Sequence, residues 1–168
     1  SITHLGRHND PQTLDSLKQY FFSSQLPPID LEKCQIMKLG KAKGVIVGGC
    51  LSLLATSMGT PYELETDGNI LFFEDTDEKV YAVDRMLTQL KNAGKLKKVK
   101  AILIGSLFPK EKESHSMDEM LQEVLADFQG PIVTGLLIGH THPFMTLPLG
   151  VSATLDTKQS ELIFDPSH

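Results

Sequence analysis

Cysteine is scarce in this sequence, and its scarcity limits both the type of scaffold and the compartment. The 168 residues include two cysteines, Cys34 and Cys50. Two are too few for the disulfide framework that small secreted domains use in place of a large core. We therefore expect two free thiols in a reducing compartment.

Other absences exclude further classes of protein. No apolar run approaches the roughly 20 residues of a membrane-spanning helix, so no membrane association is expected. The formal net charge is -5, which argues against non-specific nucleic-acid binding because that binding needs a basic face. A small anionic substrate is not excluded. The chain begins without an initiator methionine or a signal peptide, which predicts that it is a piece of a longer protein.

A nucleophile motif is also missing. Neither Ser52 nor Ser106 lies in a Gly-x-Ser-x-Gly turn, the strained turn that exposes the nucleophile of many serine hydrolases. What is present is ordinary for a globular domain, with 40% hydrophobic and 22% charged residues. A chain of this length can bury one core, or one core with an appended arm.

Apolar periodicity, capping residues and Gly/Pro breaks outline the elements. They predict helices at 10–22, 50–58 and 78–92, a helix capped by Ser116 with Glu119 in a capping box, and strands at 33–39, 45–47, 69–73, 99–107, 132–138, 146–155 and 161–164. The turn at 40–44 predicts a hairpin between the first two strands, and the turn at 156–160 predicts another between the last two. Residues 109–116 are expected to form a loose loop.

The order of these elements predicts the fold class. Strands and helices alternate in the middle of the chain, which favours parallel pairing with helical crossovers. The ends favour hairpins. We expect an α/β fold, a mixed sheet with helical crossovers and added antiparallel strands.

Two segments carry candidate chemistry. Glu74 is expected to end an apolar strand, and ligands of open α/β sheets bind beyond the carboxyl ends of strands. There a carboxylate could orient a histidine; the alternative is a solvated acid at a strand end. The acidic run at 74–78 lacks the glycine and the distal ligand of an EF-hand loop. His140 follows an apolar strand and a glycine, so it is either a base that meets substrate or an ordinary surface histidine.

Metal binding and thiol chemistry are two further alternatives. His140 and His142 would lie on one side of an extended strand, a spacing found in metal sites, with Glu74, Asp75 or Cys50 as possible further ligands. Separately, Gly48-Gly49-Cys50 forms a strand-to-helix turn, where backbone N–H groups could hold an anion and activate the thiol. The alternative there is a tight turn followed by a small packed residue.

Four segments, in order, resemble the C-terminal domain of LD-carboxypeptidases, the muramoyltetrapeptide carboxypeptidases of peptidase family S66. The segments are Gly48-Gly-Cys-Leu-Ser-Leu-Leu, Gly59-Thr-Pro-Tyr62, Ile70-Leu-Phe-Phe-Glu-Asp with the helix after it, and Ile138-Gly-His140 with Pro148-Leu-Gly-Val151. The resemblance covers about 10–164 and implies a swivelling β/β/α domain.

The resemblance also implies roles for individual residues. Glu74 would be the acid and His140 the base of a Ser-Glu-His triad, with Glu78 the second choice for the acid and His142 a bystander. Gly49 and Cys50 would bind substrate or orient the loop, and Cys50 stands where the family commonly has asparagine. The implied mechanism requires no metal and no cofactor.

The function implied is that of a cytoplasmic serine carboxypeptidase that removes the terminal D-alanine from murein tetrapeptide in peptidoglycan recycling. The nucleophile would lie on an N-terminal domain, with 1–29 as a lead-in helix and linker and 30–168 as the C-terminal domain. This fragment alone is expected to be inactive. Its expected partners are the peptide substrate, the nucleophile domain and a second copy in a homodimer. The segments 107–109 and 143–145 are expected to line the face left bare.

Three alternatives stay open at this point. One lies within the family, a microcin-immunity-type peptidase that cleaves peptidyl-nucleotide toxins. The second is a metal-dependent hydrolase that uses His140 and His142. The third is a non-catalytic domain that binds a partner or regulates.

Overall fold

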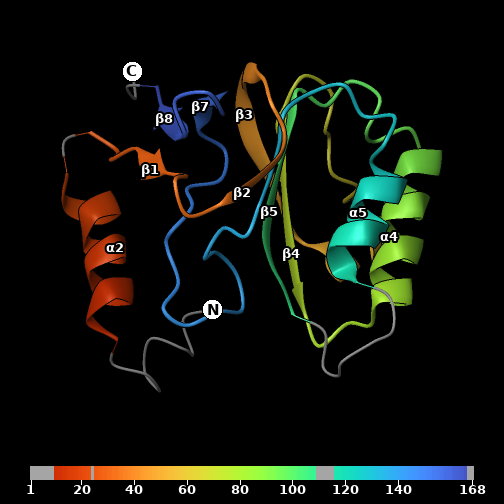
Figure 1. Cartoon of the computed structure of the whole chain (residues 1–168), viewed down its shortest axis with the longest axis horizontal. Helices are drawn as coiled ribbons and strands as arrows, with labels where there is room; N and C mark the ends of the chain where they lie inside the picture. The colour runs from red at the N-terminus through yellow and green to blue at the C-terminus, as the bar shows by residue number, and fades with distance from the viewer. Residues whose placement is uncertain (1–9, 24, 109–115, 166–168) are drawn as a thin grey trace.

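One long strand, β3 (Lys41–Cys50), joins the two halves of an eight-stranded mixed sheet (Figure 1). The structure is a computed structural model and describes residues 10–23, 25–108 and 116–165. The strand order is β1-β8-β7-β3-β4-β5-β6-β2. The first half of β3 pairs antiparallel with β7, and its second half pairs parallel with β4. The predicted α/β class with a mixed sheet is therefore confirmed.

The parallel half is built from strand–helix–strand crossovers, as the alternating pattern predicts. Its elements are α3 (Leu51–Thr56), β4 (Ile70–Thr76), α4 (Val80–Asn92), β5 (Ala101–Phe108), α5 (Met117–Val124) and β6 (Ile132–Thr134). The capping box that the sequence predicts at Ser116 and Glu119 is present. In Figure 1, α4 and α5 cover the same side of the sheet.

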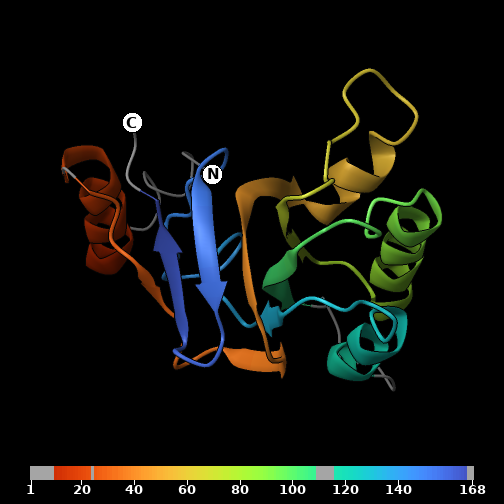
Figure 2. The ribbon, with the colours of Figure 1, turned by 90° about the horizontal axis from the view of Figure 1, so that it is seen from above.

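The antiparallel half extends the sheet at the other edge. There β7 (Ser152–Asp156) pairs with β8 (Glu161–Phe164) in the predicted hairpin, and the short β1 (Ile29–Asp30) adds to β8. Seen from above, these strands lie between β3 and helix α2 (Pro11–Phe22) (Figure 2). Helix α2 begins at the predicted cap, Asp10, whose side chain accepts the N–H groups of Gln12 and Thr13.

The predicted hairpin between 33–39 and 45–47 is wrong. Strand β2 (Gln35–Lys38) pairs antiparallel with β6 at the far edge of the sheet. The supposed turn is the start of β3, because Lys41 and Lys43 alternate with Ala42 as in a strand with one polar face. These lysines form ion pairs with Asp156 at 3.0 Å and Asp165 at 2.8 Å.

Two other predicted strands are shorter than expected. Strand β6 stops at Thr134 because Gly135 follows with a φ of 81°, a turn conformation. Strand β7 starts only at Ser152, since the preceding residues of the predicted strand include Pro148, which cannot donate to a ladder. Residues 135–151 between these strands contain no helix or strand, and the part at 139–147 is named the histidine loop.

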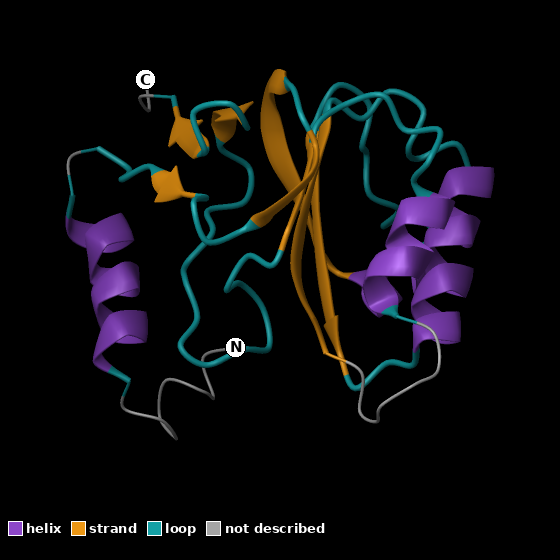
Figure 3. Ribbon diagram, viewed as in Figure 1, coloured by secondary structure: helices purple, strands orange, loops and turns teal. Residues whose placement is uncertain are grey.

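Successive side chains of the central strands divide between two cores. One core lies under α3, α4 and α5 and contains Leu71 and Phe73. The other lies on the opposite face, contains Ile70 and Phe72, and is covered by the antiparallel strands and the histidine loop. Figure 3 shows the helices as outer layers with the strands between them. None of the described helices is long and apolar enough to cross a membrane.

Candidate active site

Glu74 lies inside strand β4, and its side chain is 8% exposed. The prediction that it ends the strand is wrong, because β4 continues to Thr76 alongside β5. It is two residues from Phe72, so its side chain points to the same face as that phenylalanine, away from α4 and α5. A buried carboxylate needs partners that replace water.

His140 supplies those partners. Its ring Nδ1 lies 2.8 Å from Oε2 of Glu74, and its backbone N–H donates to the same oxygen at 3.1 Å. The predicted adjacency of these two residues, 66 positions apart, is therefore confirmed. The His140 side chain is 39% exposed. The carboxylate favours the tautomer with hydrogen on Nδ1, which leaves Nε2 with the lone pair that a general base needs.

Gly139 makes this contact possible. Its φ is 106°, a region that L-residues with side chains avoid. A Cβ atom at this position would lie 2.3 Å from Oε2 of Glu74. The loop can therefore bring the His140 backbone and ring to the carboxylate only with glycine there.

Asp75, the next residue of β4, faces the opposite side and holds the turn before α3. Its carboxylate accepts the Ser52 N–H at 2.8 Å and the Thr76 N–H at 2.9 Å, and the Cys50 thiol lies 3.6 Å from it. The sequence indicates Asp75 only as a possible metal ligand. Alternation along the strand could have indicated it, because Asp75 shares its face with the buried Phe73.

Gly49 and Cys50 end strand β3 directly beside Glu74. Cys50 is the register partner of Glu74 across the β3–β4 pair, and Gly49 is that of Phe73. The helix that follows begins at Leu51, close to the predicted position. Asp75 already accepts the Ser52 N–H in the first turn of this short helix. Gly48 and Gly49 belong to strand β3, not to the predicted turn, and Cys50 is only partly buried, so the chain passes directly from the strand into α3.

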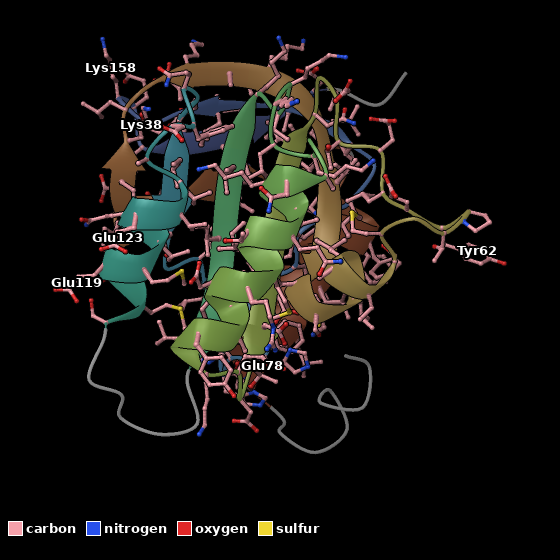
Figure 4. All side chains as sticks on the ribbon, turned by 90° about the vertical axis from the view of Figure 1, so that its right-hand side faces the viewer. Lys38, Tyr62, Glu78, Glu119, Glu123 and Lys158 are labelled. Carbon is pink, nitrogen blue, oxygen red and sulfur yellow. The ribbon has the colours of Figure 1, made fainter. Side chains whose placement is uncertain are left out.

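The other candidate groups are arranged differently. No three His, Cys, Asp or Glu side chains converge on a possible metal position within residues 10–23, 25–108 and 116–165. The His-Thr-His segment is not an extended strand as expected but part of a loop. Glu78 precedes α4 and lies at the lower end of that helix in Figure 4. Both described cysteines are free, as predicted.

The segments expected to line a bare face are described in part. Pro109 and most of the predicted loose loop fall outside the described residues, as does the side chain of Phe108. Phe144 is half-buried, and Met145 packs against the second core. Tyr62, which extends from the loop after α3 (Figure 4), is 88% exposed.

Comparisons with known proteins identify the family of this chain. Residues 43–155 match the family model of the LD-carboxypeptidase C-terminal domain. The chain is 36% identical over 160 residues to the "Probable murein peptide carboxypeptidase" of Bacillus subtilis (strain 168), covering 92% of this chain and 50% of the relative. It is 36% identical over 126 residues to the Microcin C7 self-immunity protein MccF of Escherichia coli, covering 73% of this chain and 37% of that protein.

A solved structure shows the same fold over most of the chain. It is that of the muramoyltetrapeptide carboxypeptidase from Oxalobacter formigenes, with 32% identity and a TM-score of 0.80, covering 92% of this chain and 54% of that one. The apo wild-type structure of the Microcin C7 self-immunity protein has 34% identity and a TM-score of 0.70, with 79% and 41% covered. This chain therefore spans about half the length of the relatives it matches.

Proposed function

The chain belongs to the LD-carboxypeptidase family, peptidase family S66, by its match to the C-terminal domain, and from that premise we propose that it carries the acid and base of a serine carboxypeptidase. The observation that supports this proposal best is the 2.8 Å contact between Glu74 and His140. A buried carboxylate beside a partly exposed imidazole is the arrangement of the acid and the base in a triad.

The third member of the triad is a nucleophilic serine. We place it in the part of the longer relatives that this chain does not span, because neither Ser52 nor Ser106 lies in the Gly-x-Ser-x-Gly turn of a nucleophile. Ser106 is buried, and its hydroxyl lies 3.5 Å from the Ile138 carbonyl. In the proposed mechanism Nε2 of His140 takes the serine proton as the hydroxyl attacks the scissile carbonyl. His140 then returns the proton to the leaving amine, while Glu74 stabilises the imidazolium.

The substrate we propose is a murein tetrapeptide, from which the enzyme releases the terminal D-alanine. Support comes from the sequence match, which covers 92% of this chain for the probable murein peptide carboxypeptidase and 73% for the Microcin C7 self-immunity protein. From the family resemblance we also propose a role in cytoplasmic peptidoglycan recycling. In this proposal 30–168 is the acid–base domain and 1–29 is its lead-in. The proposed assembly is a homodimer.

A second candidate is a peptidase of the microcin-immunity type. It is favoured by the 36% identity to the Escherichia coli protein and by the solved complex of the Microcin C7 self-immunity protein with aspartyl sulfamoyl adenosine. Both candidates use the same acid and base, so the substrate alone separates them.

The test compares substrates and chain lengths. The natural longer protein is incubated with a tetrapeptide that ends in an L,D-linked D-alanine, and separately with aspartyl sulfamoyl adenosine, and the free D-alanine and aspartate are measured. We expect D-alanine release by the longer protein and none by the 168-residue chain. Cleavage of the sulfamoyl compound alone would favour the second candidate, and D-alanine release by the isolated chain would place the nucleophile within it.

A further inference from the structure

Helix α2 is bound to the histidine loop by two hydrogen bonds that span most of the chain. The Phe144 N–H donates to Oγ1 of Thr13 at 3.1 Å, 131 positions away, and the Thr146 N–H donates to Oγ of Ser16 at 2.8 Å. We propose that Thr13 and Ser16 are positioning residues that hold the histidine loop so that His140 stays against Glu74. The catalytic consequence rests on the proposed function, whereas the positioning itself does not.

Thr13 is unusual for its place in the helix. Helix α2 is mostly exposed, yet Thr13 is 2% exposed. Burying a hydroxyl costs least where the group both donates and accepts a hydrogen bond. Here the hydroxyl accepts from the Phe144 N–H and donates to the Asp10 carboxylate at 2.6 Å. Thr13 thus connects the helix cap to the loop backbone.

The charge at the helix cap supports the same connection. The hydrogen bond from the Thr13 hydroxyl, together with two backbone N–H bonds and a smaller contribution from His142, holds the pKa of Asp10 below its usual value. His142 belongs to the histidine loop and Asp10 caps α2. The Thr13 hydroxyl that holds Asp10 ionised is thus the same group that accepts the Phe144 N–H of the loop.

The loop is also held from its other side. The Met145 N–H donates to the Leu137 carbonyl at 2.6 Å, so neighbouring residues are bonded alternately to α2 and to the segment before His140. Helix α2 has its own support, since the Tyr20 ring packs edge-on against Phe164 of β8 at 6.0 Å between centroids. The loop is therefore fixed between the end of β6 and a helix that is itself docked on the sheet.

Helix α2 lies outside the residues that match the family model. The matched residues are 43–155, and α2 ends 21 positions before the first of them. We infer that the unit that positions His140 includes α2, so 11–22 acts as part of the acid–base domain and not only as a lead-in to it.

Thr146 provides a matched control. Its side-chain hydroxyl is buried and has no hydrogen-bond partner among the described residues. Thr146→Val and Thr13→Val make the same chemical change, loss of a hydroxyl with the shape kept, in the same contact region. Only Thr13→Val removes a bond between helix and loop. Thr13→Ser restores the hydroxyl and serves as the rescue variant.

The deciding measurement is amide hydrogen exchange by NMR in this chain, which needs no activity. Thr13→Val with Ser16→Ala should speed exchange at Phe144 and Thr146, and also at His140, whose N–H is bound by Glu74, by about 10-fold or more through local opening. Thr146→Val and Thr13→Ser should stay within about 2-fold. Unchanged exchange at His140 in the double variant would overturn the proposal, as would an equal increase in Thr146→Val.

The catalytic consequence is measured in the longer protein. Thr13→Val should lower kcat for D-alanine release by about 10-fold with KM nearly constant, because misplacement of the base affects the chemical step more than binding. Thr13→Ser should recover most of this loss. A change in KM alone, or no recovery with serine, would contradict positioning. If the wild-type longer protein releases no D-alanine, the proposed function fails, while the exchange experiment still decides whether α2 holds His140.

Discussion

Gly139→Ala should separate Glu74 from His140 without altering either residue. The added methyl would lie 2.3 Å from Oε2 and 2.6 Å from Cδ of the Glu74 carboxylate. Contacts this short cannot persist, so either the carboxylate rotates away or the loop moves outward. Both responses lengthen the 2.8 Å contact to Nδ1 of His140.

The expected loss of stability has two parts. A side chain at a φ of 106° costs about 1–3 kcal/mol in backbone strain. The overlap with Glu74 adds about 1–3 kcal/mol, the usual cost of overpacking a filled site. We therefore expect the free energy of unfolding to fall by roughly 2–6 kcal/mol. Because part of this cost is relieved by moving the carboxylate, we expect a value in the lower half of that range.

Gly150→Ala is the matched control. Gly150 also has a positive φ, 79°, but a Cβ atom there would meet nothing within 4 Å. It should lose only the strain part, about 1–3 kcal/mol. Urea denaturation of both variants of this chain gives the comparison, and D-alanine release by the longer protein gives the catalytic effect. Equal destabilisation of the two variants, with full activity in Gly139→Ala, would refute the claim that Gly139 makes room for Glu74.

Three further predictions concern the surroundings of the site and the fold. Asp75→Asn should lower the free energy of unfolding by about 1–3 kcal/mol, because the buried carboxylate binds the Ser52 N–H; an unchanged urea midpoint would contradict this. Ser116→Ala removes the side chain that accepts the Glu119 N–H and should cost about 0.5–2 kcal/mol in the same titration, whereas no loss would mean that the capping box adds nothing. Burial raises the pKa of Tyr20 to about 12, so its contribution to stability is complete below about pH 10 and is lost as the pH rises through the folded-state value. Alkaline unfolding should therefore be steeper in wild type than in Tyr20→Phe, and identical curves would refute the burial argument.

Much of the fold follows from local patterns in the sequence. The capping box at Ser116 and the helix start at Asp10 were predictable because each depends on residues within one turn. The parallel half followed from alternating strands and helices. The partner of β2 did not, because strand pairing is decided by contacts far along the chain, and a glycine-bounded stretch between two strands resembles a turn. Here that stretch, 40–44, extends β3.

The site was predictable only through resemblance to a family. Glu74 and His140 are 66 positions apart, and no spacing rule brings such residues together. The role of Asp75 depends on which face of β4 it occupies, and that face became clear once the strand was known to continue past Glu74. The bonds from Thr13 and Ser16 to the histidine loop join the two ends of the chain. The contacts of Glu74 with His140 and of α2 with the histidine loop are tertiary, so composition and periodicity carry no signal for them.

The most direct test of the central claim is the turnover number of His140→Ala beside that of His142→Ala, in the longer protein with a murein tetrapeptide as substrate. The two histidines lie two residues apart in one loop, so damage to the loop should affect both variants alike. We predict that His140→Ala loses at least about 100-fold in D-alanine release, as expected for removal of a general base, and that His142→Ala stays within a few-fold of wild type. Glu74→Ala should behave like His140→Ala. Near-wild-type turnover in His140→Ala, or a collapse in His142→Ala accompanied by loss of a bound metal, would contradict the account.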